Sequence, residues 1–86
     1  MNEQLIGVVS HYWGKISVAG IDLTDGDLSV GDEIHIKGVH DDFTQKVESM
    51  QIDMQDVETA KKGESVGIKV IQKAHEHDKV YKIIPE

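Results

Sequence analysis

The sequence contains no cysteine and no arginine, and its one proline is next to the C-terminus. Without cysteine, neither a disulfide framework nor a thiolate metal site is available, and such a composition is compatible with a reducing cytoplasm. Without arginine, the chain lacks the planar side chain that contacts phosphates and guanine through two hydrogen bonds at once. The sixteen acids exceed the nine lysines and give a net charge of −7. General nucleic-acid binding is therefore disfavoured, because its affinity depends on neutralising phosphates.

Long apolar runs are also absent from the sequence. None reaches the roughly 7–15 residues of a signal-peptide core, and none approaches the length of a membrane span. Residues 1–5 include the acid Glu3 where a signal peptide would carry lysines. We therefore predict a soluble, cytoplasmic protein that does not bind membranes. Because 86 residues can build one core, we predict a single domain over residues 1–86, with its folded part at about 5–84.

Glycine and aspartate divide the chain into short β-branched segments in which apolar and polar residues alternate. This alternation is typical of strands. The predicted strands cover residues 6–10, 15–23, 33–37, 43–52, 65–70 and 80–84. Residues 11–14, 24–27 and 38–42 are predicted turns or loops, and only residues 53–62 have the spacing of a short helical turn. In the second strand, Ile16 and Val18 share a face, and Ile21 continues that face only if a bulge lies near residues 19–20.

One pattern occurs twice, thirty-two residues apart. Residues 28–36 and 60–68 each contain a small or apolar anchor, a glycine, an acid and then an alternating strand. The glycine, Gly31 or Gly63, suits a turn with positive φ, and the acid, Asp32 or Glu64, can accept a hydrogen bond from a free turn amide. Short strands joined by such turns predict an all-β fold, specifically a small closed six-stranded β-barrel.

The ordered set of these segments resembles domain 2 of translational GTPases such as elongation factor Tu. The resemblance covers about residues 5–84 and is carried by residues 28–34, 46–51, 60–68 and 78–81. Two related groups of proteins resemble the chain even more closely at residues 11–12 and 43–52. They are stand-alone elongation-factor-like proteins and the C-terminal barrel of collagenase-like peptidases. The resemblance implies a six-stranded barrel that, in full-length factors, packs against a GTPase domain and helps to contact ribosomal RNA or tRNA.

This chain lacks the parts that would make it a GTPase. Gly14-Lys15 is followed by Ile16 and has no upstream glycine-rich loop for phosphates. The RNA-contacting residues of the family cannot be matched to positions here. We therefore predict neither nucleotide binding nor any other cofactor.

Catalytic patterns are missing too, so we predict that the chain is not an enzyme. Ser10 and His11 are adjacent in a predicted strand and point to opposite faces, which prevents proton sharing. Five histidines suggest a metal site, with His75 and His77 on one side of an extended segment and residues 40–42 adding oxygen ligands. Because no recognised ligand spacing is present, we predict no metal site and interpret these residues as a polar hairpin end.

Two groups of residues are candidates for binding a partner. Tyr12 and Trp13 lie in a predicted turn, where Trp13 either contacts a partner or folds back over the end of the barrel. The second group is a set of lysines that either lines one flank or is scattered in solvent: Lys61, Lys62, Lys69, Lys73 and Lys79. We predict a non-catalytic binding module that resembles domain 2 of translational GTPases and contacts a protein. The alternative is an RNA-binding accessory of translation that uses Trp13 and the lysines.

Overall fold

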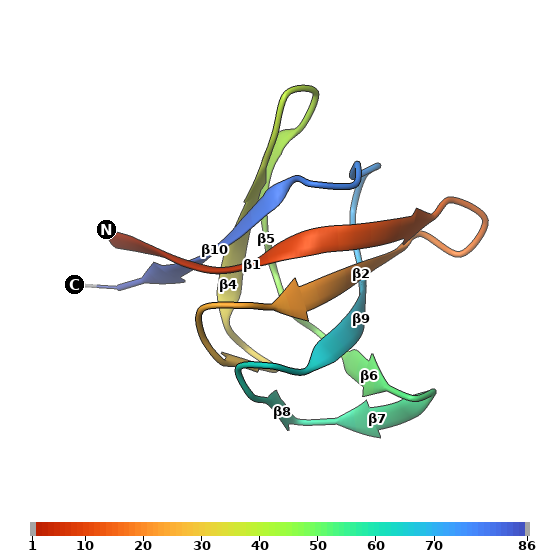
Figure 1. Ribbon diagram of the computed structural model, residues 1–86, viewed down its shortest axis with the longest axis vertical. Coiled ribbons are helices and arrows are strands. Elements are labelled where there is room, and N and C mark those ends of the chain that lie inside the picture. The colour runs from red at the N-terminus through yellow and green to blue at the C-terminus, as the bar shows by residue number, and fades with distance from the viewer. Residues whose placement is uncertain (1, 86) are drawn as a thin grey trace.

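The computed structural model describes residues 2–85 and contains strands and turns but no helix in that range. The prediction of an all-β fold is confirmed (Figure 1). The strands are β1 (Asn2–Trp13), β2 (Val18–Leu23), β3 (Leu28–Ser29), β4 (Glu33–Lys37), β5 (Asp42–Lys46), β6 (Met50–Ile52), β7 (Gln55–Val57), β8 (Thr59–Ala60), β9 (Ser65–Lys69) and β10 (Lys79–Ile84). Nothing within residues 2–85 forms a helix of the length and hydrophobicity needed to span a membrane.

Eight of the strands form one antiparallel sheet in the order β5-β4-β10-β1-β2-β9-β6-β7, and β3 pairs separately with β8. The sheet curves around the core (Figure 1). Its end strands, β5 and β7, do not pair with each other among the described residues. The predicted closure into a six-stranded barrel is therefore not confirmed: the ladder of strand pairs has two ends.

A side chain spans part of the opening that the strand pairs leave. The amide of Gln45, in β5, donates to the carbonyl oxygen of Lys69 and accepts from the backbone N–H of Ile71, both at 2.8 Å. The Gln45 amide thus makes the two hydrogen bonds that a paired strand would make with its backbone. A cavity of about 310 Å³ lies beside this bridge, lined in part by Gln45, Val70 and Ile71. The bridge links the β5 edge to the segment after β9.

The strands in the middle of the sheet, β10, β1, β2 and β9, supply half of the buried apolar side chains. The bulge lies on the opposite strand from the one predicted. The pairing of β1 with β2 shifts register between Val9 and His11, so the irregularity is in β1. Strand β2 pairs with β9 without a register shift and directs Ala19, Ile21 and Leu23 into the core. Ile16 precedes the strand and is 56% exposed, so its predicted place on the core face is wrong.

Both copies of the repeated turn form as predicted. Gly31 and Gly63 have φ angles of 98° and 96°. Residues other than glycine rarely adopt such values. Asp32 accepts a hydrogen bond from the Ser29 N–H at 2.9 Å, and Glu64 accepts one from Lys61 at 2.7 Å. The two copies meet because Leu28 pairs with Ala60 in β3 and β8, and both side chains are fully buried.

The repetition extends to the backbone around each glycine. Gly31 donates to the Val47 carbonyl and Val47 donates to that of Asp32, both at 2.8 Å. In the second copy, Gly63 donates to Leu23 at 2.7 Å and Leu23 donates to Glu64 at 2.9 Å. Each turn is therefore tied by the same pair of bonds to the residue at or just after the end of another strand.

Three local predictions are wrong. Residues 53–62 contain no helical turn; Asp53 and Met54 have positive φ and connect β6 to β7. The predicted long strand at 43–52 is two strands, because the chain leaves β5 after Lys46 and β6 begins at Met50. The predicted turn at 11–14 is mostly strand, since β1 extends to Trp13.

Candidate functional site

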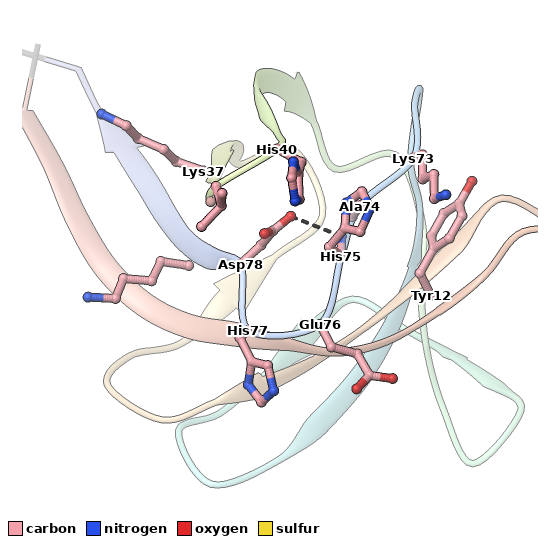
Figure 2. Close-up of a pocket in the computed structure, with 12 residues that line it drawn as sticks. Tyr12, Lys37, His40, Lys73, Ala74, His75, Glu76, His77 and Asp78 are labelled. Carbon is pink, nitrogen blue, oxygen red and sulfur yellow. Dashed lines mark hydrogen bonds between the residues drawn. The ribbon is translucent and has the colours of Figure 1, made fainter.

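A groove lies where β1 ends and β10 begins. It has a volume of about 820 Å³ and is formed by Tyr12 of β1, residues 37–40 after β4, and residues 73–79 before β10 (Figure 2). Three histidines, His40, His75 and His77, contribute to its lining. The groove thus brings together segments that are distant in sequence.

Backbone hydrogen bonds hold the two turns that form the groove. Gly38 donates to the Asp41 carbonyl at 2.8 Å, and Asp78 donates to the His75 carbonyl at 3.1 Å. The second turn is also fixed to β1, because His77 donates to Val9 at 2.9 Å and Val9 donates to Asp78 at 2.8 Å. His77 has a φ of 76°, a strained conformation that these bonds maintain.

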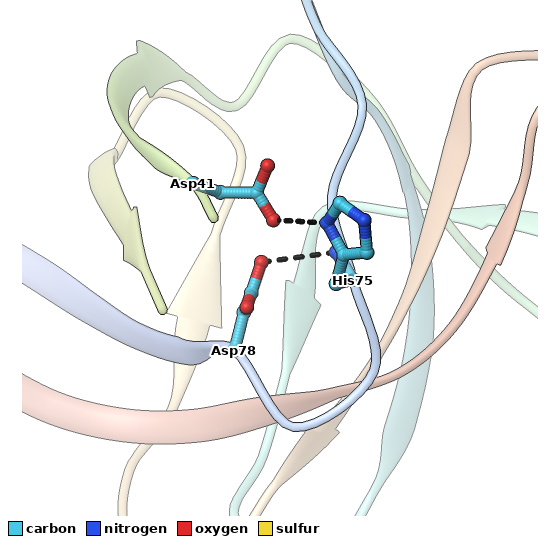
Figure 3. Close-up of side chains that lie close together, drawn as sticks. All are labelled: Asp41, His75 and Asp78. Carbon is cyan, nitrogen blue, oxygen red and sulfur yellow. Dashed lines mark hydrogen bonds and ion pairs between the residues drawn. The ribbon is translucent and has the colours of Figure 1, made fainter. Parts of the chain in front are cut away.

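Asp41, His75 and Asp78 form a cluster between these turns (Figure 3). The Nδ1 atom of His75 is 2.6 Å from Oδ2 of Asp41, and the His75 backbone N–H donates to Oδ2 of Asp78 at 3.0 Å. Both aspartates are buried, with exposed fractions of 7% for Asp41 and 3% for Asp78. The Asp78 carboxylate lies where a Cβ at position 38 would be, so this packing requires Gly38.

The pKa values of the two aspartates move in opposite directions. Burial opposes ionisation of Asp41, but hydrogen bonds with Asp78 and His75 outweigh it and lower the pKa of Asp41. Burial raises the pKa of Asp78, and the hydrogen bond with Asp41 raises it further. Asp41 is therefore the more acidic and Asp78 the less acidic carboxyl of this pair.

His40 extends this group of polar side chains toward solvent. Its ring centroid is 5.2 Å from that of His75, and Figure 2 shows both rings at the same end of the groove. His75 is itself 40% exposed at its side chain. The cluster is therefore reached from the groove through His75 while its carboxylates stay covered.

The lysines that the sequence analysis selected do not form one flank. Lys73 and Lys79 contribute to the groove, Lys69 lines the smaller cavity beside Gln45, and Lys61 and Lys62 lie in the turn between β8 and β9. Lys73 and Tyr12 line the same groove. The structure thus distributes these five lysines over three places.

Tyr12 and Trp13 point to different surroundings because they are consecutive in a strand. Tyr12 packs against the core and lines the groove. Trp13 is 46% exposed; its ring lies edge-on to His11 at 4.5 Å and covers Gly20. Trp13 therefore rests on the sheet while keeping nearly half of its surface in solvent.

The structure joins part of the histidine set considered from the sequence. His75 meets Asp41, which lies in the loop considered as a source of oxygen ligands, but His77 points away from the cluster (Figure 2). Sequence reasoning missed Asp78. The signal for it was its position next to an apolar strand, three residues after His75, where its side chain can accept a hydrogen bond from a turn amide.

A second histidine contacts two acids on the sheet surface. His35 in β4 is 2.9 Å from Glu3 of β1 through Nδ1, and its Nε2 contacts Asp42 of β5. The hydrogen bonds with Glu3 and Asp42 raise the pKa of His35. The bond with His35 also lowers the pKa of Asp42.

Comparison with known proteins identifies the relatives of this chain. An uncharacterized protease of Methanocaldococcus jannaschii is 47% identical over 77 residues, which are 88% of this chain and 19% of the protease. A collagenase of Porphyromonas gingivalis is 36% identical over 78 residues, which are 90% of this chain and 22% of the collagenase. The chain therefore spans about a fifth of the length of these relatives. No family model matches the sequence.

Solved structures show the same fold. The crystal structure of the C-terminal domain of a predicted U32 peptidase from Geobacillus thermoleovorans has a TM-score of 0.87 at 20% identity, covering 94% of this chain and 93% of that one. A selenomethionine variant of that domain has a TM-score of 0.84, also at 20% identity, covering 90% of this chain and 96% of that one. The homologues are thus proteases and collagenases, and the fold is that of a U32 peptidase C-terminal domain.

These relatives correct the function predicted from the sequence. The resemblance to collagenase-like peptidases is supported, whereas the module of translational GTPase type is wrong, together with its RNA-binding alternative. The likeness to elongation factors misled because the glycine-acid turns define a β architecture, and an architecture does not determine function.

Proposed function

We propose that this chain is a non-catalytic accessory domain of a U32-type peptidase, which contacts the catalytic part of that peptidase and helps it to hold a polypeptide substrate. The observation that carries the proposal is the extent of the sequence match. About nine-tenths of this chain aligns with a fifth of a protease from one organism and a fifth of a collagenase from another. A segment of that size, with its own core, has the properties of a module attached to a larger enzyme.

The hairpin between β1 and β2 supplies the surface best suited to this contact. Its tip exposes Trp13 at 46% and Ile16 at 56%, and the neighbouring Tyr12 continues it into the groove. Tryptophan and tyrosine are enriched among the residues that contribute most to protein–protein binding. We therefore assign the contact to the hairpin tip and the adjoining groove.

The chemistry of the groove favours binding over catalysis. Its lining within residues 2–85 includes no serine, threonine or cysteine to serve as a nucleophile. Two carboxylates that share a proton are also the catalytic pair of aspartic peptidases. Here, however, Asp41 and Asp78 are covered and bonded to His75. A catalytic pair must instead present its oxygens to water and to the scissile bond.

The test uses a related peptidase from which the segment that aligns with this chain has been deleted. This chain is then mixed with the remaining catalytic part. We expect a one-to-one complex in gel filtration and calorimetry, and a several-fold faster cleavage of gelatin, a substrate chosen because two relatives are named collagenases. Trp13→Ala is expected to weaken the complex by at least about tenfold, as the loss of a central aromatic contact does.

Met54→Ala is the matched control, because Met54 is also apolar and is 92% exposed but lies on the β6–β7 turn. It should leave binding unchanged. The proposal fails if the chain forms no complex and does not alter the cleavage rate. It also fails if the chain alone cleaves gelatin.

A further inference from the structure

We propose that Asp41, His75 and Asp78 bind one divalent metal ion of the zinc class. The oxygen and nitrogen atoms that they offer all lie within 4.8 Å of one another. Aspartate and histidine are common zinc ligands. The ligands come from two turns, residues 38–41 and 75–78, so a bound ion would link the beginning of β5 to the beginning of β10.

The geometry is close to that of an occupied site. Tetrahedral zinc with bonds of about 2.0–2.2 Å holds its ligand atoms roughly 3.3 Å apart. The contact between Asp41 and His75 is 2.6 Å and has to widen by less than about 1 Å on that basis.

The charges of the cluster supply a separate reason. Asp41 and Asp78 face each other with 7% and 3% of their surface exposed, and two carboxylates in such surroundings are costly without compensation. Within residues 2–85, His75 is the one basic side chain that forms an ion pair with either aspartate. His75 is charged only when protonated. Figure 2 shows the ammonium group of Lys37 directed away from the cluster. A divalent ion would take the place of the proton that the pair otherwise shares and would balance the charge of both carboxylates at once.

The surrounding turns hold the ligands in place before an ion arrives. Gly38 leaves room for the Asp78 carboxylate, and the Gly38–Asp41 and His75–Asp78 backbone bonds fix both turns. His75 is 40% exposed in its side chain and provides the route of entry from the groove. His40, whose ring is 5.2 Å from that of His75, is placed to add a fourth ligand or to bond a bound water.

The ligand set selects the kind of ion. Calcium requires six to eight oxygen ligands, and magnesium keeps most of its water. One imidazole and two carboxylates, with an open position toward His40, instead suit zinc or a similar transition metal. This proposal departs from the sequence prediction of no metal site, which considered His77 and did not include Asp78.

The test uses the isolated chain, so it is independent of any peptidase partner. After treatment with EDTA, we expect one Zn²⁺ per chain in calorimetry and a visible absorption spectrum of tetrahedral type with Co²⁺. A Kd of about 1 μM predicts that 100 μM Zn²⁺ raises Tm by roughly 10 °C or more.

Asp78→Asn is the informative variant. An asparagine oxygen still accepts the His75 N–H bond and its amide donates to Asp41, so the fold is kept while a metal ligand is lost. We expect Zn²⁺ binding to weaken at least about tenfold in this variant and in His75→Gln, with His77→Gln unchanged as the control.

Two results would overturn the proposal. Absence of a Tm shift and of a Co²⁺ spectrum in the EDTA-treated protein would mean that the cluster only joins the two turns. Equal Zn²⁺ binding by the Asp78→Asn and parent chains would place the ion on exposed histidines elsewhere.

Discussion

Individual side chains link strands in addition to the backbone pairing, and His35 is the clearest example. It reaches Glu3 on β1 and Asp42 on β5 from its own strand β4, and its ring is 6.1 Å from that of Tyr81 on β10. Both acidic partners favour the protonated imidazole. The three strands are thus joined more strongly when His35 is charged.

The stability of the protein should depend on pH through His35. Since the pKa of His35 is raised above 6.5 in the folded chain, its contribution is fully present below the unfolded value and is lost as pH rises through the folded value. Urea unfolding of the parent chain should show a fall in stability as pH increases from about 6 to 8.

His35→Gln should remove that fall, because glutamine does not titrate. His11→Gln is the control, because His11 also lies near an acid, Glu76, at 3.3 Å, but is half exposed. The stability of the His11→Gln chain should still fall as pH rises. Identical pH profiles for the parent and His35→Gln chains would contradict the assignment.

At the scale of elements, the repeated glycine-acid turns determine where the chain reverses. Gly31 and Gly63 have open space where a Cβ would be, so glycine is required at both positions by φ and not by packing. Gly31→Ala and Gly63→Ala should each destabilise the fold by roughly 1–3 kcal/mol, the cost of a side chain in this backbone region. Urea unfolding measures both.

Gly14→Ala is the matched control for these two substitutions. Gly14 has no positive φ, and its added Cβ would make an ordinary 3.6 Å contact with Tyr12. Its effect should be well below 1 kcal/mol. If Gly14→Ala were as costly as the other two, backbone conformation would not be the cause.

Several strands were predictable because their cause is local. Residues 33–37 and 65–69 alternate apolar and polar side chains, and the structure has β4 and β9 there. The error at residues 53–62 has a physical reason: the spacing of Met54 and Val57 resembles a helical turn, but Met54 is 92% exposed at a hairpin turn. Three-residue spacing in a short polar segment does not identify a helix.

The bulge in β1 was misplaced because register depends on the partner strand. The sequence shows a change of phase near Gly20, but either strand of a pair can accommodate the extra residue. The structure puts it in β1, between Val9 and His11. The cluster of Asp41, His75 and Asp78 was only partly predicted, because no local sequence pattern relates two turns so far apart in sequence.

At the scale of the whole molecule, the sheet is held together across its opening by Gln45. Gln45→Met keeps the length of the side chain but removes both bonds to residues 69 and 71. We expect a loss of about 1–2 kcal/mol and faster hydrogen exchange at the Ile71 amide. Gln51→Met is the control, because among residues 2–85 the side-chain amide of Gln51 bonds to Asp56 on the adjacent strand at 3.0 Å and does not reach across the opening.

Unchanged exchange at Ile71 in Gln45→Met would show that the opening does not depend on this side chain.

The sequence predicted the all-β class but not this arrangement. A long strand at 43–52 would have continued the ladder, whereas the break after Lys46 leaves an edge that a side chain has to cover.

We propose that this fold serves a peptidase by contacting its catalytic part, and this contact can be observed residue by residue. The most direct measurement is a ¹⁵N NMR titration of the chain with that part, prepared from a related peptidase without its homologous fifth. We expect shifted or broadened amide signals around Trp13, Ile16 and the groove, with the β6–β7 turn unaffected. Spectra that stay unchanged throughout the titration, or changes confined to the β6–β7 turn, would contradict it.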